Sequence, residues 1–198
     1  MSIRLIITHP GGAHKDDFLA CSLMVSVHGV PIVRRDPSEQ ELDDPSVCII
    51  DVGGRHEPKN NNFDHHQFPR DHKPTCALSL ILQHLGMYED AQMFCDWLEP
   101  AEWFDCRGPQ KTAAWLGVPR EVVGKLNSPI DISMLRRFAK ITPDSELHAG
   151  DPIYELMCYI GGDLLEYLKS VRSKLDSVSA HVERWEVSSG GESFDVLF

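Results

Sequence analysis

Short apolar runs and longer amphipathic segments alternate along the first part of the chain. Apolar runs at residues 4–8, 31–35 and 47–52 predict three strands, and glycine-rich turns follow the first and the last of them. Residues 18–27 are apolar with a helical tendency, and a helix is expected to begin near Asp16, where carboxylates suit the first turn. Strands that alternate with helices predict an α/β fold, with a mostly parallel sheet flanked by helices.

The rest of the pattern is mainly helical. Residues 55–73 are polar and long for a loop, which is typical of a functional or disordered segment. Helices are then expected at about 75–86, 88–104, 109–117, 119–126 and 131–140. A turn at 188–191 and a short strand at 194–197 end the printed sequence.

Residues 153–181 predict one long helix, because their apolar residues recur every three or four positions. Gly161 and Gly162 weaken this prediction locally. The helix either packs on the sheet or forms a helix-pair or dimer contact. We therefore expect a domain at 1–145, followed by a segment at 151–198 that packs on it or forms an oligomer contact.

Composition narrows the possible partners. The formal net charge is −11, and no dense block of lysine and arginine occurs. Long duplex DNA is disfavoured, because phosphate neutralisation by a basic face drives such binding. The chain lacks a long apolar run and the features of a signal peptide, so we expect no membrane contact and a cytoplasmic location. Its six cysteines form no C-x-x-C pair and are interpreted as reduced thiols.

Residues of the types that bind metals follow two of the predicted strands and recur in the polar segment after the third. Ligands in open α/β sheets bind at the carboxyl ends of the strands. Imidazole nitrogens and carboxylate oxygens together suit Mn, Fe, Co or Zn. Each motif alone has an ordinary alternative, such as a capping carboxylate or an exposed histidine, but their order along the chain is specific. The motif residues are His9, His14, Asp16 and Asp17, then Asp51, then Asp64, His65 and His66.

These motifs resemble those of the DHH phosphoesterase superfamily, and most closely the melanocyte-proliferating-gene-type exonuclease family, an uncharacterised conserved family. The matching stretches are residues 8–20, 50–54, 63–67 and 103–108, with a weaker match at 77–86. The family usually has Glu at the position of Asp17 and Asn at that of Cys106. The resemblance covers roughly residues 3–110, and a second substrate-binding domain is not recognisable.

The resemblance implies a two-metal site. One metal would be held by His9, His14 and Asp51, and the other by Asp16, Asp51, His65 and Asp105. Asp64 would hold an adjacent histidine, while His66 would bind the phosphate or assist the leaving group. Two divalent ions are implied, with Mn favoured over Mg by the histidine ligands and with Co or Zn as alternatives.

Other residues carry weaker predictions. Arg107, Arg70 and Lys73 are candidate contacts to the substrate, with a surface or solvated-loop role as the alternative. Arg34 and Arg35 are expected to be surface charges. Three tryptophans are expected to be core anchors, with a role as base-stacking platforms as the less favoured alternative: Trp97, Trp103 and Trp115.

The resulting hypothesis is a Mn-dependent hydrolase of phosphoester bonds, a phosphodiesterase or exonuclease acting on nucleotides or short single-stranded oligonucleotides. The alternatives are a phosphomonoesterase or pyrophosphatase, and a non-catalytic module that binds metal or nucleotide. A third class is an interaction protein, for example a homodimer, that assembles through the helix at 153–181.

Overall fold

The computed structural model describes residues 2–125 and 128–197, and its centre is a six-stranded sheet in the order β4-β5-β3-β1-β2-β6. Strand β1 is parallel to β2 and to β3, and β5 is parallel to β3, whereas the edge strands β4 and β6 are antiparallel to their neighbours. The strands are β1 (Leu5–Thr8), β2 (Ile32–Arg34), β3 (Val47–Ile50), β4 (His56–Glu57), β5 (Asn62–Phe63) and β6 (Glu146–Leu147). The predicted α/β fold with a mostly parallel sheet is confirmed.

The three predicted strands are present, but the segment 55–73 is not wholly a loop. It contains β4, the 3-10 helix η1 (Pro58–Asn60) and β5. Asn62 and Phe63 pair with Ile49 and Ile50 of β3. Strands of two residues are too short to produce a periodic pattern, so their extended conformation depends on the neighbouring strand.

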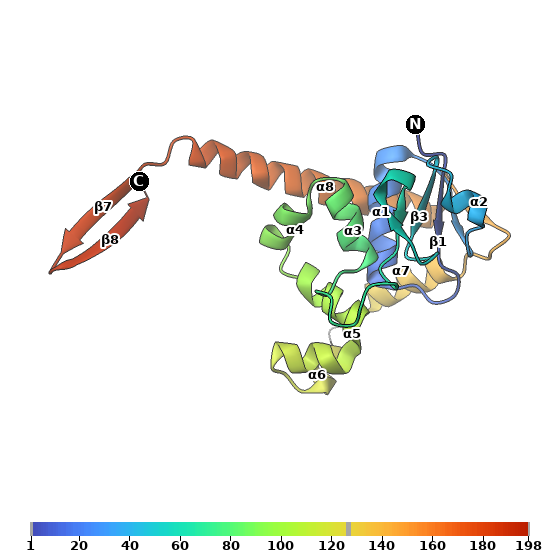
Figure 1. Ribbon diagram of the computed structural model, residues 1–198, viewed down its shortest axis with the longest axis horizontal. Coiled ribbons are helices and arrows are strands. Elements are labelled where there is room, and N and C mark those ends of the chain that lie inside the picture. The colour runs from blue at the N-terminus through green and yellow to red at the C-terminus, as the bar shows by residue number, and fades with distance from the viewer. Residues whose placement is uncertain (1, 126–127, 198) are drawn as a thin grey trace.

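The main hydrophobic core lies on one face of the sheet. Helices α1 (Lys15–His28), α3 (Ala77–His84) and α8 (Pro152–Ser179) contribute buried residues to it, and they gather on one side of the strands in Figure 1. A smaller cluster on the other face includes Leu42 of α2 (Glu39–Leu42). Residues of β1 alternate between the two clusters, as the period of a strand requires.

The helices between α3 and α8 differ from the predicted boundaries. They are α4 (Tyr88–Phe94), α5 (Leu98–Leu116), α6 (Arg120–Gly124) and α7 (Pro129–Ala139). The predicted break between 104 and 109 corresponds to a kink in α5 at Gly108, whose φ of 73° and ψ of 168° are not helical, so two helical segments meet there. The kink precedes Pro109, which lacks an amide hydrogen and disfavours helical geometry at the residue before it.

Helix α8 begins and ends close to its predicted limits. Its first half packs on α1 with Tyr154, Met157 and Leu165 in the core, and Arg172 farther along pairs with Asp90 of α4. The last turns of α8, after Arg172, extend beyond the body of the molecule (Figure 1). It carries a hairpin of β7 (Arg184–Ser189) and β8 (Glu192–Leu197), of which only β8 was predicted. The division into residues 1–145 and 151–198 stays a prediction. None of the helices in the described residues is long and apolar enough to cross a membrane.

Candidate metal centre

The candidate site lies at the carboxyl ends of three adjacent parallel strands. His9 follows β1, Asp51 follows β3, and Asp64 begins the segment after β5. Asp51 has a φ of 60°, in the left-handed region that costs a non-glycine residue about 1–2 kcal/mol. Its amide still donates to the carbonyl of Phe63 (3.0 Å), so the turn is held against β5 while the carboxylate points into the cluster. A strained aspartate held in this way is typical of functional sites.

The N-terminus of α1 brings a second set of side chains to the same edge. His14 is the N-cap residue, and its amide donates to the carboxylate of Asp17 (2.8 Å). Asp16 lies in the first turn beside Asp17, and both are buried. The chain therefore places His14 and Asp16 opposite Asp51.

Asp17 and Arg34 form a buried ion pair next to the site, and neither role was predicted from the sequence. Arg34 was predicted to be a surface charge, but its exposed fraction is 0%. Its guanidinium donates to the carboxylate of Asp17 (3.3 Å) and to the carbonyl of Gly12 (3.1 Å), and it lies over the ring of Phe138. The prediction was wrong because Arg34 ends β2 at the edge of the sheet that carries the other polar residues, a signal that was present in the strand pattern.

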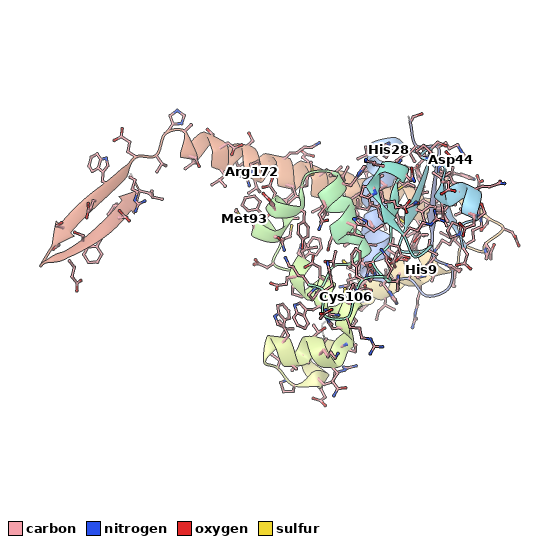
Figure 2. All side chains as sticks on the ribbon, in the orientation of Figure 1. His9, His28, Asp44, Met93, Cys106 and Arg172 are labelled. Atoms are coloured by element: carbon pink, nitrogen blue, oxygen red, sulfur yellow. The ribbon has the colours of Figure 1, made fainter. Side chains whose placement is uncertain are left out.

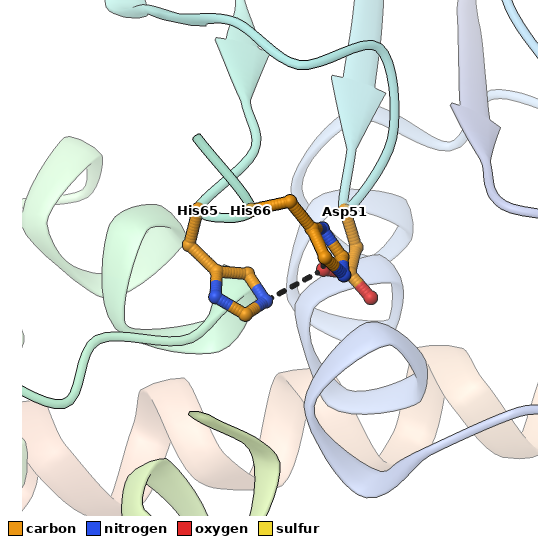
Figure 3. A group of neighbouring side chains, drawn as sticks. All are labelled: Asp51, His65 and His66. Carbon is orange, nitrogen blue, oxygen red and sulfur yellow. Dashed lines mark ion pairs between the residues drawn. The ribbon is translucent and has the colours of Figure 1, made fainter. Parts of the chain in front are cut away.

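Two histidines are oriented in the same way. The Nδ1 of His9 faces the carbonyl of Pro10 (2.9 Å), and the Nδ1 of His65 faces the Sγ of Cys106 (3.9 Å). Each Nε2 is buried and makes no hydrogen bond within the described residues, although carboxylate oxygens surround it. Nε2 of His65 lies 3.0 Å from Asp51 and 3.1 Å from Asp105 (Figure 3 shows the contact with Asp51).

Three carboxylates complete this cluster. Asp16 and Asp51 are 2% and 3% exposed, and Asp105 of α5 is also largely buried. Both oxygens of Asp16 lack a hydrogen-bond partner in the part of the chain that the structure describes. A buried carboxylate without a donor is costly, so the arrangement fits a bound cation. Carboxylate oxygens and free imidazole nitrogens are also the donors that such an ion requires.

The pKa shifts of the clustered residues reflect how close their charged groups lie to one another. Burial and the neighbouring Asp51 and Asp105 raise the pKa of Asp16 well above its usual value. Burial opposes the charged form of His65, but Asp105 and Asp51 raise its pKa to about 12. Asp105 raises the pKa of His14 to about 9. Without metal, protons on these histidines neutralise the nearby carboxylates. A divalent ion could supply the same positive charge, so metal would compete with those protons.

The candidate ligands group differently from the predicted sets. Within the described residues, three groups have ligand atoms within 4.8 Å of one another. They are Asp51 with His65 and His66, His65 with Asp105 and Cys106, and His14 with Asp16 and Asp105. His14 thus joins Asp105, whereas the predicted set of His9, His14 and Asp51 is not among these groups.

Asp64 and His66 form a separate contact at the edge of the cluster. Asp64 accepts from the amide of Gly54 (2.6 Å) and from the amide of His66 (3.0 Å), and its Oδ1 lies 2.7 Å from the Nδ1 of His66. Burial alone would raise the pKa of Asp64, but these contacts lower it overall. The side chain of His66 stays exposed, so Asp64 orients an accessible imidazole.

Cys106 was outside every predicted role, and it contacts both a backbone segment and His65. Its Sγ lies 3.3 Å from the amide nitrogen and 3.3 Å from the carbonyl oxygen of Thr75. The thiol can therefore donate to Thr75 while its sulfur accepts from the Nδ1–H of His65. Figure 2 labels Cys106 and His9 on opposite sides of this region.

A pocket of about 270 Å³ opens beside the cluster. Its lining includes five residues at or beside the cluster: His14, His65, His66, Asp105 and Cys106. Residues between 68 and 75 also line it, including the predicted substrate contacts Arg70 and Lys73, and so does Arg107. Arg107 donates to the carbonyl of His72, and Lys73 lies over the ring of Tyr88. The structure thus brings all three predicted cationic side chains to the pocket.

Comparisons with known proteins point to one family over part of the chain. Residues 5–86, less than half of the chain, match MYG1_exonuc, described as "Uncharacterised protein family (UPF0160)". The chain is 41% identical to the MYG1 exonuclease of Rattus norvegicus over 64 residues, which are 30% of this chain and 16% of that protein. It is 32% identical to a MYG1 protein of Chlamydia pneumoniae over 109 residues, which are 52% of this chain and 31% of that protein.

Several of these relatives are named exonucleases, and the wider DHH superfamily stays a resemblance of motifs. The aligned part of the chain spans less than a third of the curated relatives that it matches. No solved structure matches the chain. Asp105 and Cys106 lie outside the residues that match the family, so their place in the cluster comes from the tertiary structure.

Proposed function

We propose that this protein is a metal-dependent hydrolase that cleaves phosphodiester bonds in nucleotides or short single-stranded oligonucleotides. The relatives of the chain include proteins named exonucleases, and a hydrolase of this class needs a cluster of metal ligands beside a cationic pocket.

One observation carries the proposal. His9 and His65 are each held through Nδ1, and each turns a buried Nε2 without a hydrogen bond toward carboxylate oxygens. Metal-binding histidines are commonly fixed in this way, by a contact of the nitrogen that does not bind the metal. Asp16 adds a buried carboxylate without a donor among the described residues, and a bound cation would compensate its charge.

The residues that would hold divalent ions share one edge of the sheet: His9, His14, Asp16, Asp51, His65 and Asp105. The mixture of imidazole and carboxylate favours Mn over Mg, because Mg prefers shells of oxygen alone. Such ions would neutralise the phosphate and lower the pKa of the attacking water.

The remaining side chains have roles of their own. Arg70, Lys73 and Arg107 line the pocket and would hold the phosphate against the net charge of −11. His66 is exposed beside the cluster, and the carboxylate of Asp64 raises its pKa. His66 can therefore carry the proton that the leaving oxygen requires near neutral pH.

The test compares hydrolysis by the full chain after EDTA treatment and after addition of Mn²⁺. The substrates are bis(p-nitrophenyl) phosphate and a short single-stranded oligonucleotide, with p-nitrophenyl phosphate and pyrophosphate as the competing classes. Turnover should require Mn²⁺, and kcat/KM should be highest for the diesters. Asp51→Asn should lower kcat/KM on the order of 100-fold or more.

The matched control is Asp163→Asn, since Asp163 is an exposed aspartate of α8 outside the site. It should leave turnover unchanged. Turnover that survives chelation, or an Asp51→Asn protein as active as the wild type, would overturn the proposal. Tight Mn²⁺ binding without turnover of any substrate would instead identify a non-catalytic module.

A further inference from the structure

A projecting arm lies next to the candidate site. It consists of residues 107–125, which include the end of α5 and all of α6, and we call it the α5–α6 arm. In Figure 1, α6 lies apart from the sheet, beyond the kinked end of α5. The arm starts at the pocket, because Arg107 lines the pocket and precedes the kink at Gly108.

Aromatic side chains lie on the arm and on the turn of α5 that precedes it. The rings of Trp103 and Trp115 are stacked, with centroids 5.0 Å apart and planes 8° apart. Trp115 is 37% exposed and Phe104 is 44% exposed, so the expected role of Trp115 as a buried core anchor was wrong. Trp103 lies one helical turn before Arg107, on the same side of α5. The stacked pair therefore lies on the same part of α5 as Arg107, which lines the pocket.

The arginines of the protein differ in whether they pair with a carboxylate. The four arginines before residue 70 each form an ion pair with a carboxylate: Arg4, Arg34, Arg35 and Arg55. Among the described residues, the five arginines from 70 to 137 form none: Arg70, Arg107, Arg120, Arg136 and Arg137. Among the described residues no carboxylate neutralises these five guanidinium groups, although Arg107 also donates to the carbonyl of His72.

The sequence of the arm is basic although the chain is acidic. Residues 107–125 contain Arg107, Lys111, Arg120 and Lys125, with Glu121 as the single carboxylate, in a chain of net charge −11. Lys111 and Trp115 are four residues apart after the kink, so a cation and an indole lie on the same side of that turn. The surface thus combines exposed aromatic rings with unpaired cations.

We propose that the α5–α6 arm binds single-stranded nucleic acid and guides it into the pocket. Proteins that bind single strands combine cations that follow the backbone with aromatic rings on which bases stack. Unpaired bases are required for stacking, so a duplex does not fit this surface. This inference rests on the proposed function for its direction, because the strand runs toward the candidate metal centre.

The experiment measures binding and turnover separately with the full chain. Binding of fluorescein-labelled oligo(dT) and oligo(U) of 2, 4, 8 and 12 nucleotides is followed by fluorescence anisotropy in EDTA, which removes the contribution of metal. Turnover of bis(p-nitrophenyl) phosphate and of an unlabelled oligonucleotide of eight nucleotides is followed with Mn²⁺. The variants are Trp115→Ala and the double variant Lys111→Gln with Arg120→Gln.

Trp115→Ala should weaken binding of the longer strands about 5-fold to 100-fold, the effect of losing one stacked base. The double variant should weaken binding and also reduce the slope of log K against log salt by about 0.7 for each lost phosphate contact. Both variants should raise KM for the eight-nucleotide oligonucleotide and leave turnover of bis(p-nitrophenyl) phosphate unchanged. The double variant keeps all aromatic residues, so it tests the surface if Trp115→Ala fails to fold.

The matched control is Lys169→Gln with Lys174→Gln, two exposed lysines of α8 away from the arm. It should change neither binding nor salt slope. The inference is overturned if affinity does not rise with strand length, or if the control weakens binding as much as the arm variants. Length-dependent binding without any turnover would leave the arm standing and overturn the proposed function. If the arm variants do not change turnover of the eight-nucleotide strand, the inference about the arm is overturned and the proposed function stands.

Discussion

At the scale of single residues, the side chains of the site take their properties from partners distant in the sequence. Arg34 is buried because Asp17 and the carbonyl of Gly12 meet it at the edge of the sheet. His65 is oriented because Cys106, on another helix, lies beside its Nδ1. Neither partner is a neighbour along the chain, so neither contact could be read from a local motif.

Cys106 should therefore influence the affinity of the site for metal. Cys106→Ala removes the sulfur that faces Nδ1 of His65, and it should weaken Mn²⁺ binding about 10-fold to 100-fold. Cys106→Asn should retain most of the affinity, because its amide can accept from Nδ1–H and donate to Thr75. The measurement is isothermal titration of the metal-free protein with Mn²⁺.

Cys158→Ala, a change to a half-buried thiol of α8, serves as the control and should bind Mn²⁺ like the wild type. If Cys106→Ala also binds like the wild type, Cys106 has no part in orienting His65.

At the scale of elements, the crossing of α1 and α8 depends on one glycine. A Cβ added to Gly161 would lie 2.0 Å from the carbonyl oxygen of Ser22 in α1, whereas one added to Gly162 meets nothing within 4 Å. The two glycines looked equivalent in the sequence, where both weakened the predicted helix. In the structure, Gly161 permits the close approach of the two helices and Gly162 only lowers helix propensity.

Alanine substitutions at Gly161 and Gly162 should change the free energy of unfolding in opposite directions. Gly161→Ala should destabilise the protein by about 1–3 kcal/mol, because the clash with backbone forces α8 away from α1. Gly162→Ala should stabilise it by about 0.5–1 kcal/mol through helix propensity alone. Urea unfolding of the two variants measures both effects, and equal effects would show that the helices do not cross as described.

The short helix α2 should make stability depend on pH. Glu41 accepts from Arg35 and from Ser38, and these contacts lower the pKa of Glu41 from 4.5 to about 2. A carboxyl with a lowered pKa in the folded state contributes stability above its unfolded pKa. This contribution disappears as the pH falls from about 4.5 toward 2.

Because the pair is largely solvated, its contribution should be about 1 kcal/mol. Glu41→Gln should reduce the free energy of unfolding by that amount at pH 7, and the difference should shrink below pH 4. The exposed Glu121→Gln, whose carboxylate accepts no hydrogen bond in the described chain, should cost nothing at either pH. A Glu41→Gln difference that is constant with pH would contradict this account.

At the scale of the whole molecule, the balance of charge couples folding to metal. The folded chain buries Asp16 without a donor among the described residues, which opposes folding of the metal-free form at neutral pH. A divalent ion would compensate this cost and would stabilise the folded state, by about 2.7 kcal/mol at a concentration 100 times its Kd.

Chelation should therefore lower the melting temperature, and Mn²⁺ should restore it. Asp16→Asn should raise the melting temperature of the chelated protein, because a neutral amide replaces the buried charge, and it should reduce the shift caused by Mn²⁺. Differential scanning calorimetry with and without EDTA measures both changes. Asp163→Asn should respond to Mn²⁺ like the wild type, and an unchanged shift in Asp16→Asn would remove Asp16 from the site.

Local patterns were sufficient for the class of fold and for most of the residues of the candidate site. Runs such as 4–8 and 47–52 are apolar enough to require burial, and the period of 153–181 suits one long helix, so strands and helices follow from local energetics. His9, Asp51 and His65 could be selected because metal-binding residue types recur at strand ends or soon after them. Parallel strands bring such positions together whatever their distance along the chain.

Only the tertiary structure decided which of these side chains meet and which residues support them. Residues 62–63 form a strand because they pair with β3. The kink at Gly108 sets the direction of the α5–α6 arm, and the close approach at Gly161 holds α8 against α1. Asp105 lies beside His65, a member of its predicted set, and also contacts His14, and Cys106 gained a role beside His65. These outcomes depend on distances between residues far apart in sequence, and such distances are set by packing of the whole core and not by any local preference.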